Sequence, residues 1–327
     1  MSLAAVPDAP PEAEFLSTAA RAMSSERGDA ALDRLSFWEL LPELDDDEAA
    51  AAVFSALRAQ GRALADTPAL GGLLAQPFAT ALGVEQGTVI AAIRRDTPRR
   101  GEVWVAVGDT GGRRLLLDAP GRGTHVLDAD AAAPQPVVVA GRTTVVELEV
   151  DLDGRAPDLP DRAAAPLRDR ATYLARVGAS AELLGAAERV VDLAVEYAGA
   201  REQFGRPIGT FQALRHLLAW AATDCVAVEA VVRRAVALRR DPPPRFGDAA
   251  KALAGRNGMR ACQRALQAFG GIGFTAEHEH HHFHGRVLLL DALLGSSAEL
   301  THELGTWVRT SGDDPAYAEA VLHAGAP

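Results

Sequence analysis

The second half of the sequence consists of long apolar patterns with helical spacing, interrupted by short segments rich in glycine and proline. We expect helices over 167–200, 210–240, 247–269 and 288–309, and a last short one near 314–324. Thr210 is the expected N-cap of the second helix. The prolines at 242–244 separate the second helix from the third. Long helices with short connections predict an antiparallel bundle.

The first half predicts a different organisation, with short helices followed by short strands. Short apolar or alternating runs at 88–90, 103–107, 114–117, 124–127, 136–139 and 145–150 are separated by turns of Gly, Asp and Pro. Helices are expected at 13–25, around 35–41, from the acidic run 45–48 to about 65, and at 69–82. We expect a mainly α protein with three domains: a truncated helical domain over 1–85, a small β domain over 86–155 and a helical bundle over 156–327, with 155–166 as a linker.

Composition excludes several classes of function. The chain carries 33 basic and 44 acidic residues, a net charge of −11, which disfavours non-specific binding to nucleic acid. No apolar run is long enough for a transmembrane helix, and no signal peptide is recognisable. The two cysteines lie in apolar helical patterns and show no zinc spacing, as expected in a reducing compartment. A cytoplasmic location is the expectation.

The connection between the first two bundle helices holds a notable set of side chains. Within residues 199–212, Arg201 supplies a fixed cation, Phe204 an aromatic face and Gln212 an amide. Taken alone, this set fits either a helix connector with a solvated arginine or a site for an anionic, planar ligand. A second stretch, Gln267 followed by Gly270-Gly271-Ile272-Gly273, ends a later helix and allows a ligand to approach the backbone closely.

Together the two stretches resemble the signatures of the acyl-CoA dehydrogenase family. Arg201-Glu202-Gln203-Phe204-Gly205-Arg206-Pro207-Ile208 with Phe211-Gln212 is similar to the first signature, and 267–273 to the second. The order of helices, β domain and four-helix bundle fits the same family. The resemblance is strong over about 167–297 and weaker over 34–152. It implies a protein that binds FAD and removes two hydrogens across the α and β carbons of an acyl-CoA thioester.

The resemblance also assigns roles to individual positions. Arg201 would contact the FAD pyrophosphate, and Phe204 and Gln212 would lie against its adenosine half. Further contacts to the dinucleotide are implied for these positions: Phe211, Gln267, Gly270, Gly271. In the family such residues reach the flavin of a neighbouring subunit, which implies an oligomer. Arg176 matches an arginine near the family's active site; its alternative is an arginine paired with an acid on an adjacent helix.

The catalytic base expected from the family is missing. The reaction needs a carboxylate that takes the α-proton while the flavin takes a hydride. The family places this Glu at one of two positions, which here are Ala175 and Leu294, and neither side chain accepts a proton. The family's flavin-facing Thr-Glu-Pro and Gly-Ser-Asp segments are also missing from the β region.

A subgroup of the family explains these absences. Its members act on steroid side chains as α2β2 heterotetramers in which one short subunit has no base. Residues 271–278, with His281 and Arg286, resemble that subgroup, although Ala276 replaces its Trp. The resemblance implies a subunit of an FAD-dependent enzyme for α,β-desaturation of an acyl-CoA, with the base supplied by an unlike partner. Two alternatives stay open: a homo-oligomeric dehydrogenase with an unidentified base, for which Glu277 is a candidate, and a flavin-free structural or regulatory member of the fold. The acyl group and electron acceptor are not indicated.

A histidine cluster follows the second signature. Five imidazoles lie within seven residues: His278, His280, His281, His282 and His284. Imidazole is a common metal ligand, but two of these histidines have counterparts in the subgroup and no paired cysteine accompanies them. We therefore expect no metal.

Overall fold

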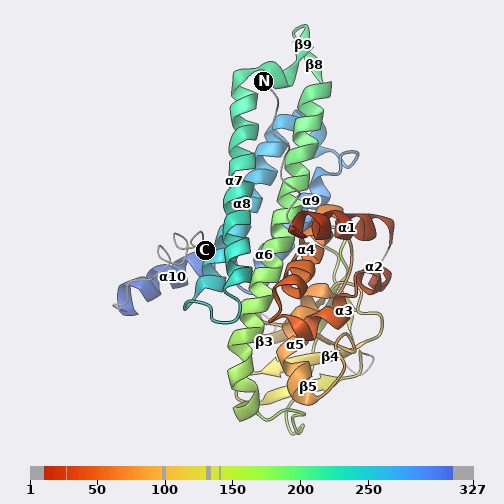
Figure 1. Cartoon of the computed structure of the whole chain (residues 1–327), viewed down its shortest axis with the longest axis vertical. Coiled ribbons are helices and arrows are strands. Elements are labelled where there is room, and N and C mark those ends of the chain that lie inside the picture. Colours follow the sequence, from red (N-terminus) through yellow and green to blue (C-terminus); the bar gives the residue numbers. More distant parts are fainter. Residues whose placement is uncertain (1–10, 27, 98–100, 130–133, 140, 312–327) are drawn as a thin grey trace.

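The computed structural model describes residues 11–26, 28–97, 101–129, 134–139 and 141–311. Long helices of the C-terminal half stand side by side, while the N-terminal helices and the strands gather near one end of them (Figure 1). The expected fold class, mainly α with a small β region, is confirmed. No described helix combines the length and apolar character that spanning a membrane requires.

The N-terminal helices match the expected positions closely. They are α1 Pro11–Ser25, α2 Asp29–Arg34, α3 Phe37–Leu40, the 3-10 turn η1 Leu41–Glu43, α4 Asp47–Ala63 and α5 Ala69–Leu82. The acidic run starts α4 as expected, because Asp46 is the N-cap and its carboxylate accepts from the amides of Glu48 and Ala49 at 2.9 and 3.0 Å.

Two small sheets follow. The strands are β1 Val89–Ala91, β2 Ile93–Thr97, β3 Gly101–Val107, β4 Arg114–Ala119, β5 Gly123–Leu127, β6 Gln135–Pro136 and β7 Val145–Leu148. They form a sheet of order β1-β4-β5 and another of order β2-β3-β7-β6. The strand β2 was not predicted, because Arg94 and Arg95 interrupt the apolar run; its pairing with β3 sets Ile93 opposite Val105.

The bundle consists of α6 Asp161–Ala200, α7 Gln212–Ala237, α8 Phe246–Phe269, α9 His280–Ala292 and α10 Ser297–Ser311, with the hairpin β8 Glu202–Gln203 and β9 Arg206–Pro207 and the 3-10 turns η3 Ile208–Thr210 and η4 Gly270–Phe274 between them. The helix α6 begins six residues before the expected position, and Pro166 lies inside it without ending it.

Two other expectations about the bundle are wrong. Thr210 is not an N-cap: its hydroxyl donates to the carbonyl of Pro207 at 2.7 Å, and Phe211 precedes the first residue of α7. The single helix expected over 288–309 is two helices, α9 and α10, because Leu294 and Gly295 have φ of 59° and 95° and cannot continue a helix. The helix expected near 314–324 lies outside the described residues.

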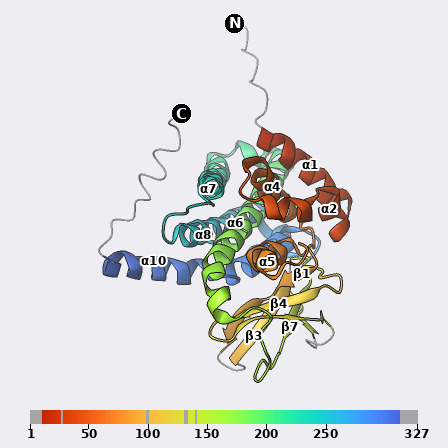
Figure 2. The same ribbon diagram turned by 60° about the horizontal axis from the view of Figure 1, so that its bottom comes forward.

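One apolar core joins the N-terminal helices to the bundle. It is built mainly from α1, α4, α6, α7, α8 and α9. Glycines bring α4 and α6 into very close contact: a Cβ at Gly61 would lie 2.0 Å from the carbonyl oxygen of Glu182, and one at Gly185 would lie 1.8 Å from that of Arg58. A smaller cluster fixes the sheets to the helices by packing α5 and α6 against β1 and β4 (Figure 2).

A buried ion pair ties three parts of the chain together. Glu182 on α6 accepts from the guanidinium of Arg286 on α9 at 2.6 Å, and both side chains are only 1% exposed. The other Glu182 oxygen accepts from the amide of Gln60 on α4 at 3.0 Å. Arg286 also donates to the carbonyl of Gly141, in the connection between β6 and β7, at 3.1 Å. The first helices, the β region and the bundle therefore share one polar junction.

Candidate functional site

The hairpin after α6 carries the first set of expected contact residues. Its loop consists of Phe204 and Gly205, whose φ values of 55° and 78° match the type I′ geometry of a two-residue hairpin. Glycine adopts this conformation easily, whereas phenylalanine does so at a cost. The loop leaves the Phe204 side chain 93% exposed at the tip of the molecule.

Around this tip the hairpin assembles two rings and a cation. The rings of Phe204 and Phe211 meet edge to face with centroids 6.1 Å apart. The guanidinium of Arg206 lies 4.2 Å from the centroid of Phe211. Arg201 and Gln212 are exposed, and within the described part of the chain their side chains make no hydrogen bond or ion pair. The hairpin end therefore carries hydrogen-bond donors without a partner among the described residues, on Arg201 and Gln212, and an exposed aromatic ring, that of Phe204.

The second signature lies at the same end of the bundle. Gln267 is exposed on the last turn of α8, and Gly270 follows the helix with φ of 63°. No heavy atom would lie within 4 Å of a Cβ at Gly270 or Gly271, so this backbone is open to a ligand. The rings of Tyr197, near the end of α6, and Phe269, the last residue of α8, have centroids 5.6 Å apart. All seven expected dinucleotide contacts thus lie at one end of the bundle (Figure 1).

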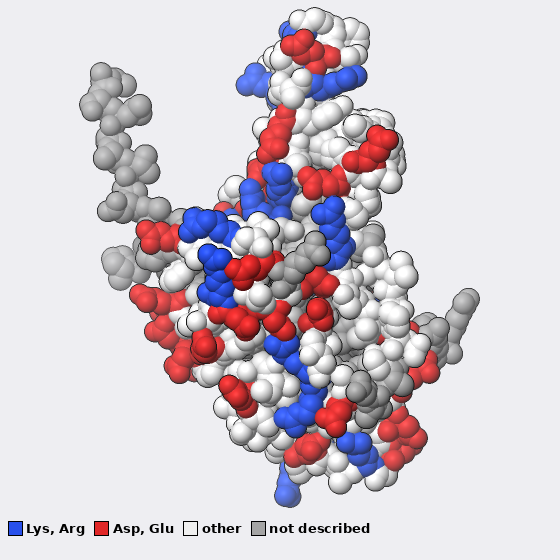
Figure 3. Space-filling view, turned by 90° about the vertical axis from the view of Figure 1, so that its right-hand side faces the viewer, with Lys and Arg blue, Asp and Glu red and all other residues white. Residues whose placement is uncertain are grey.

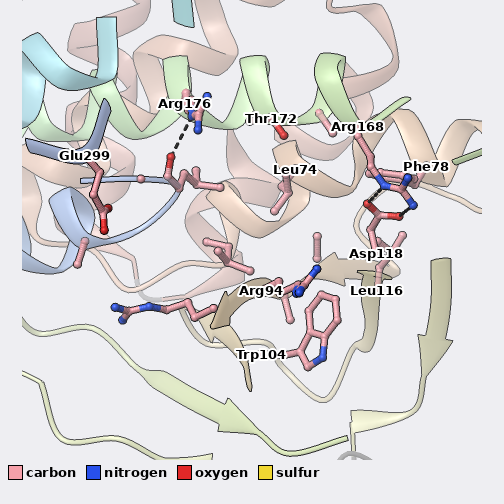
Figure 4. A pocket seen from close by; sticks show the side chains of 18 residues that line it. Leu74, Phe78, Arg94, Trp104, Leu116, Asp118, Arg168, Thr172, Arg176 and Glu299 are labelled. Atoms are coloured by element: carbon pink, nitrogen blue, oxygen red, sulfur yellow. Dashed lines mark hydrogen bonds and ion pairs between the residues drawn. The ribbon is translucent and has the colours of Figure 1, made fainter. Parts of the chain in front are cut away.

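A separate pocket lies where the strands meet α5, α6 and the α9–α10 connection. Its volume is about 370 Å³. Apolar side chains and several arginines line it: Leu74, Phe78, Ala91, Ala92, Ile93, Arg94, Arg95, Trp104, Leu116, Asp118, Arg168, Ala171, Thr172, Arg176, Ala292, Leu294, Gly295 and Glu299 (Figure 4). It suits a ligand that has both an apolar part and a polar or anionic part.

Arg176 lines this pocket but is also held by protein groups. Its Nε donates to the carbonyl oxygen of Leu294 at 2.9 Å (Figure 4). One Nη pairs with the carboxylate of Asp248 on α8. The alternative foreseen for Arg176, an arginine paired with an acid on an adjacent helix, is therefore what the structure has. A substrate contact by Arg176 remains a prediction.

The two positions expected for a catalytic Glu lie in different surroundings. Ala175 is fully buried in the main core and does not line the pocket. Leu294 lines the pocket and sits in the left-handed region with φ of 59°. A carboxylate at 294 would therefore stand in the pocket wall, where the structure has an aliphatic side chain.

Two carboxylates that the sequence analysis did not single out also line the pocket. Glu299 accepts from the amide and hydroxyl of Ser296 at 2.9 and 2.8 Å, and these hydrogen bonds hold its pKa below its ordinary value. Asp118 receives two hydrogen bonds from Arg168 (Figure 4). Glu299 is therefore a weak proton acceptor, and the Asp118 carboxylate is occupied by Arg168. Both residues lie outside the two signature stretches, so no motif in the sequence pointed to them.

The histidines around the start of α9 are engaged in local contacts. His280 is 2% exposed, and its Nε2 lies 2.9 Å from the carbonyl oxygen of Cys262. His281 contacts the carbonyl of His278, and His284 contacts the sulfur of Met259. Burial lowers the pKa of His280 and His284. Among the described residues no group of three or more His, Cys, Asp or Glu side chains is arranged to hold a metal ion.

Comparison with solved structures identifies the fold. The Tcur3481–Tcur3483 steroid ACAD G363A variant aligns with a TM-score of 0.71 at 22% identity over 92% of this chain and 98% of that one. The ChsE4–ChsE5 complex from Mycobacterium tuberculosis aligns with a TM-score of 0.68 at 19% identity over 95% and 99%. The butyryl-CoA dehydrogenase of Megasphaera elsdenii also aligns, with a TM-score of 0.66 at 17% identity over 94% and 100%. The fold is that of the acyl-CoA dehydrogenases.

Comparison with known sequences identifies the family of the chain. Residues 169–306 match the family described as acyl-CoA dehydrogenase, C-terminal domain. The chain is 34% identical over 248 residues to acyl-CoA dehydrogenase IpdE2 of Mycobacterium tuberculosis, covering 71% of each. IpdE2 of Mycolicibacterium smegmatis is 30% identical over 251 residues, covering 75% of this chain and 74% of that protein. The chain belongs to the acyl-CoA dehydrogenase family.

Proposed function

We propose that the protein is a subunit of an FAD-dependent enzyme that desaturates an acyl-CoA thioester between its α and β carbons, and that an unlike partner subunit supplies the catalytic base. The observation that carries this proposal is Leu294 in the pocket wall. An aliphatic side chain stands where the family places a carboxylate, while Ala175, the other expected position, is buried away from the pocket.

The residues at the hairpin end fit the dinucleotide chemically. A pyrophosphate favours a guanidinium and backbone N–H donors, and an adenine favours an aromatic face. Arg201 offers its guanidinium, Gly270 and Gly271 leave the backbone open to close approach, and Phe204 offers an exposed ring. Gln212 and Gln267 add exposed amides. When bound, FAD supplies a hydride acceptor.

The position of these residues favours a site shared between subunits. The contact residues lie at one end of α6, and the pocket lies beside Arg176 and Arg168, more than twenty residues earlier on the same helix. Because an α-helix rises about 1.5 Å per residue, this separation is on the order of 35 Å. One chain's hairpin end would therefore hold the dinucleotide of another chain.

In this reading the chain's own residues bind and orient the ligands, and they do not move the α-proton. Arg201 would hold the pyrophosphate, and Phe204 with Phe211 would cover the adenine. In the pocket, Leu74, Ile93 and Leu294 would exclude water from an acyl group. The proton acceptor would come from the partner, because both carboxylates of this pocket are engaged by donors of this chain.

The relatives favour a bulky acyl group and a two-chain assembly. One aligned structure is described as a steroid ACAD, and another is described as the complex of two proteins, ChsE4 and ChsE5. We therefore propose a polycyclic, steroid-derived acyl-CoA as the substrate class and an α2β2 assembly as the working form, in the cytoplasm.

Co-expression with a second acyl-CoA dehydrogenase chain from the same organism tests the proposal. We expect a two-component complex with bound FAD, seen in its mass and visible spectrum, and dehydrogenation of an acyl-CoA that the lone chain does not perform. Arg201→Ala should lower the flavin content of the complex. The matched control is Arg256→Ala, which changes an exposed arginine of α8 far from both signatures. A lone chain that purifies with stoichiometric FAD and turns over an acyl-CoA would contradict the proposal.

One observation favours the homo-oligomeric alternative enough to test it. Glu299 lines the pocket, whereas Glu277 precedes α9, a helix about 20 Å long that separates it from the pocket at the other end. If a pure homo-oligomer is active, loss of turnover in Glu299→Gln but not in Glu277→Gln would identify Glu299 as its base. A flavin-free member of the fold would leave complex activity unchanged in Arg201→Ala.

A further inference from the structure

The chain contains one lysine, and it is buried behind the pocket wall. Of the 33 basic residues counted as Lys and Arg, 32 are Arg and the remaining one is Lys251. Lys251 lies on α8, and its side chain is fully buried. Arginine stays protonated in proteins, whereas a buried lysine can lose its proton near neutral pH. The one basic side chain able to titrate in this way therefore lies in the interior.

The side-chain nitrogen of Lys251 holds the turn between α9 and α10. Its Nζ donates to the carbonyl oxygens of Asp291 and Gly295 at 3.2 and 3.3 Å. Arg176 donates to the intervening carbonyl of Leu294 at 2.9 Å. Leu294 and Gly295 both have positive φ, so the turn depends on such contacts to keep its shape. The same two residues form part of the pocket wall.

The charged groups that act on Lys251 come from three elements. Arg176 lies on α6, Asp291 on α9 and Glu299 on α10. Among the described carboxylates none lies within ion-pair distance of Nζ: Asp291 accepts from Ser297, and Asp248 pairs with Arg176 and Arg245. The ammonium is thus desolvated and has only carbonyl partners.

We propose that Lys251 is a positioning residue that makes the Leu294–Gly295 wall a proton-linked latch, closed most firmly when the amine is neutral. Burial lowers the pKa of Lys251 to about 8. If the turn swings away, water reaches Nζ and its pKa returns toward 10.5. Between about pH 8 and pH 10.5 the open state of the turn therefore binds more protons than the closed state. A rise in pH across this range favours the closed state.

The single lysine permits a direct measurement. In protein labelled only with ε-13C-lysine, the native chain gives one side-chain resonance, that of Lys251. We expect its titration midpoint near 8. A midpoint near the ordinary value of about 10.4 would overturn the proposal, because the two states of the turn would then bind protons equally.

Hydrogen exchange reports on the latch itself, without ligand or turnover. The amides of Ser296 and Ser297 are hydrogen-bonded to Glu299 and Asp291, so opening of the turn frees them. Between about pH 7 and pH 9 their protection factors should rise roughly tenfold more than those of mid-α6 amides. Lys251→Arg, which stays charged, and Lys251→Met, which never carries charge, should both lose this pH dependence. A wild-type profile that parallels Lys251→Arg, or that falls with pH, would overturn the proposal.

Discussion

At the scale of single residues, two of the non-glycine residues with left-handed backbone lie at positions that the proposed function uses. Leu294 stands in the pocket wall with φ of 59°, and Phe204 at the hairpin tip has φ of 55°. Neither residue type favours this conformation, which costs roughly 1–2 kcal/mol. Backbone strain of this kind persists where surrounding contacts hold it, and it gathers at functional sites. Both positions can be tested by substitution.

Leu294→Glu places a carboxylate in the pocket wall. If the pocket binds an acyl-CoA, this variant should exchange the α-proton of octanoyl-CoA with D2O about 100-fold faster than wild type, the lower range for a positioned base. Mass spectrometry of the recovered thioester measures the deuterium. Leu294→Gln is the matched control and should stay at the wild-type rate. Equal exchange rates for the Glu and Gln variants would show that a side chain at position 294 does not reach the α-proton of the bound acyl-CoA.

Phe204→Asn should separate stability from cofactor binding. Asparagine tolerates positive φ, so urea unfolding of the lone chain should show a gain of about 1 kcal/mol. The flavin content of the co-expressed complex should fall, because the exposed ring is lost. Phe204→Leu, which keeps the strain but removes the ring, should lose flavin without the gain in stability. If the complex keeps its full flavin content in both variants, Phe204 does not contribute to binding the dinucleotide.

At the scale of elements, the sequence predicted what depends on local pattern and missed what depends on distant contacts. The bounds of α5 and α8 followed from periodicity, and the start of α4 in the acidic run 45–48 followed from the preference for carboxylates at a helix N-terminus. The break between α9 and α10 did not, because its carbonyls are held by Arg176 and Lys251 from other helices. Likewise Asp118 and Glu299 reach the pocket only through the fold. Signature residues were found because each set is contiguous in sequence.

The junction between α4, α6, α9 and the β region rests on the buried pair Glu182–Arg286. Arg286→Met should cost about 3–5 kcal/mol in urea unfolding, because it leaves the Glu182 carboxylate buried without its partner. The double variant Glu182→Gln with Arg286→Met should recover much of this loss, since no uncompensated charge remains. A double variant as unstable as the single one would mean that packing, and not charge, determines the cost.

At the scale of the whole molecule, basic and acidic side chains pair between elements. On the face in Figure 3, arginines are interspersed with Asp and Glu. Many helices are joined by such pairs, as where Arg58 of α4 binds Glu188 of α6 and Glu229 of α7. Several histidines differ, because they are buried and desolvation acts against their charged form.

Acid should destabilise the folded chain through these histidines. Burial is the first cause that lowers the pKa of His125, His278, His280, His282 and His284 below the ordinary 6.5. The unfolded state therefore binds more protons below about pH 6.5, so stability is full above that value and is lost as pH falls. Urea unfolding between about pH 7.5 and pH 5 should show a steep decline. His280→Gln should flatten it, whereas substitution of His302, exposed on α10, should not.

The burial of the sole lysine has a consequence for chemical reactivity. Acyl thioesters transfer their acyl group to amines, and lysine side chains are the usual acceptors on proteins. Here the native surface offers no lysine amine at all, because Lys251 lies in the interior and the surface cations are guanidinium groups. A protein built in this way can work among reactive thioesters without accumulating acylated side chains, and amine-directed crosslinkers will find no lysine on its folded form.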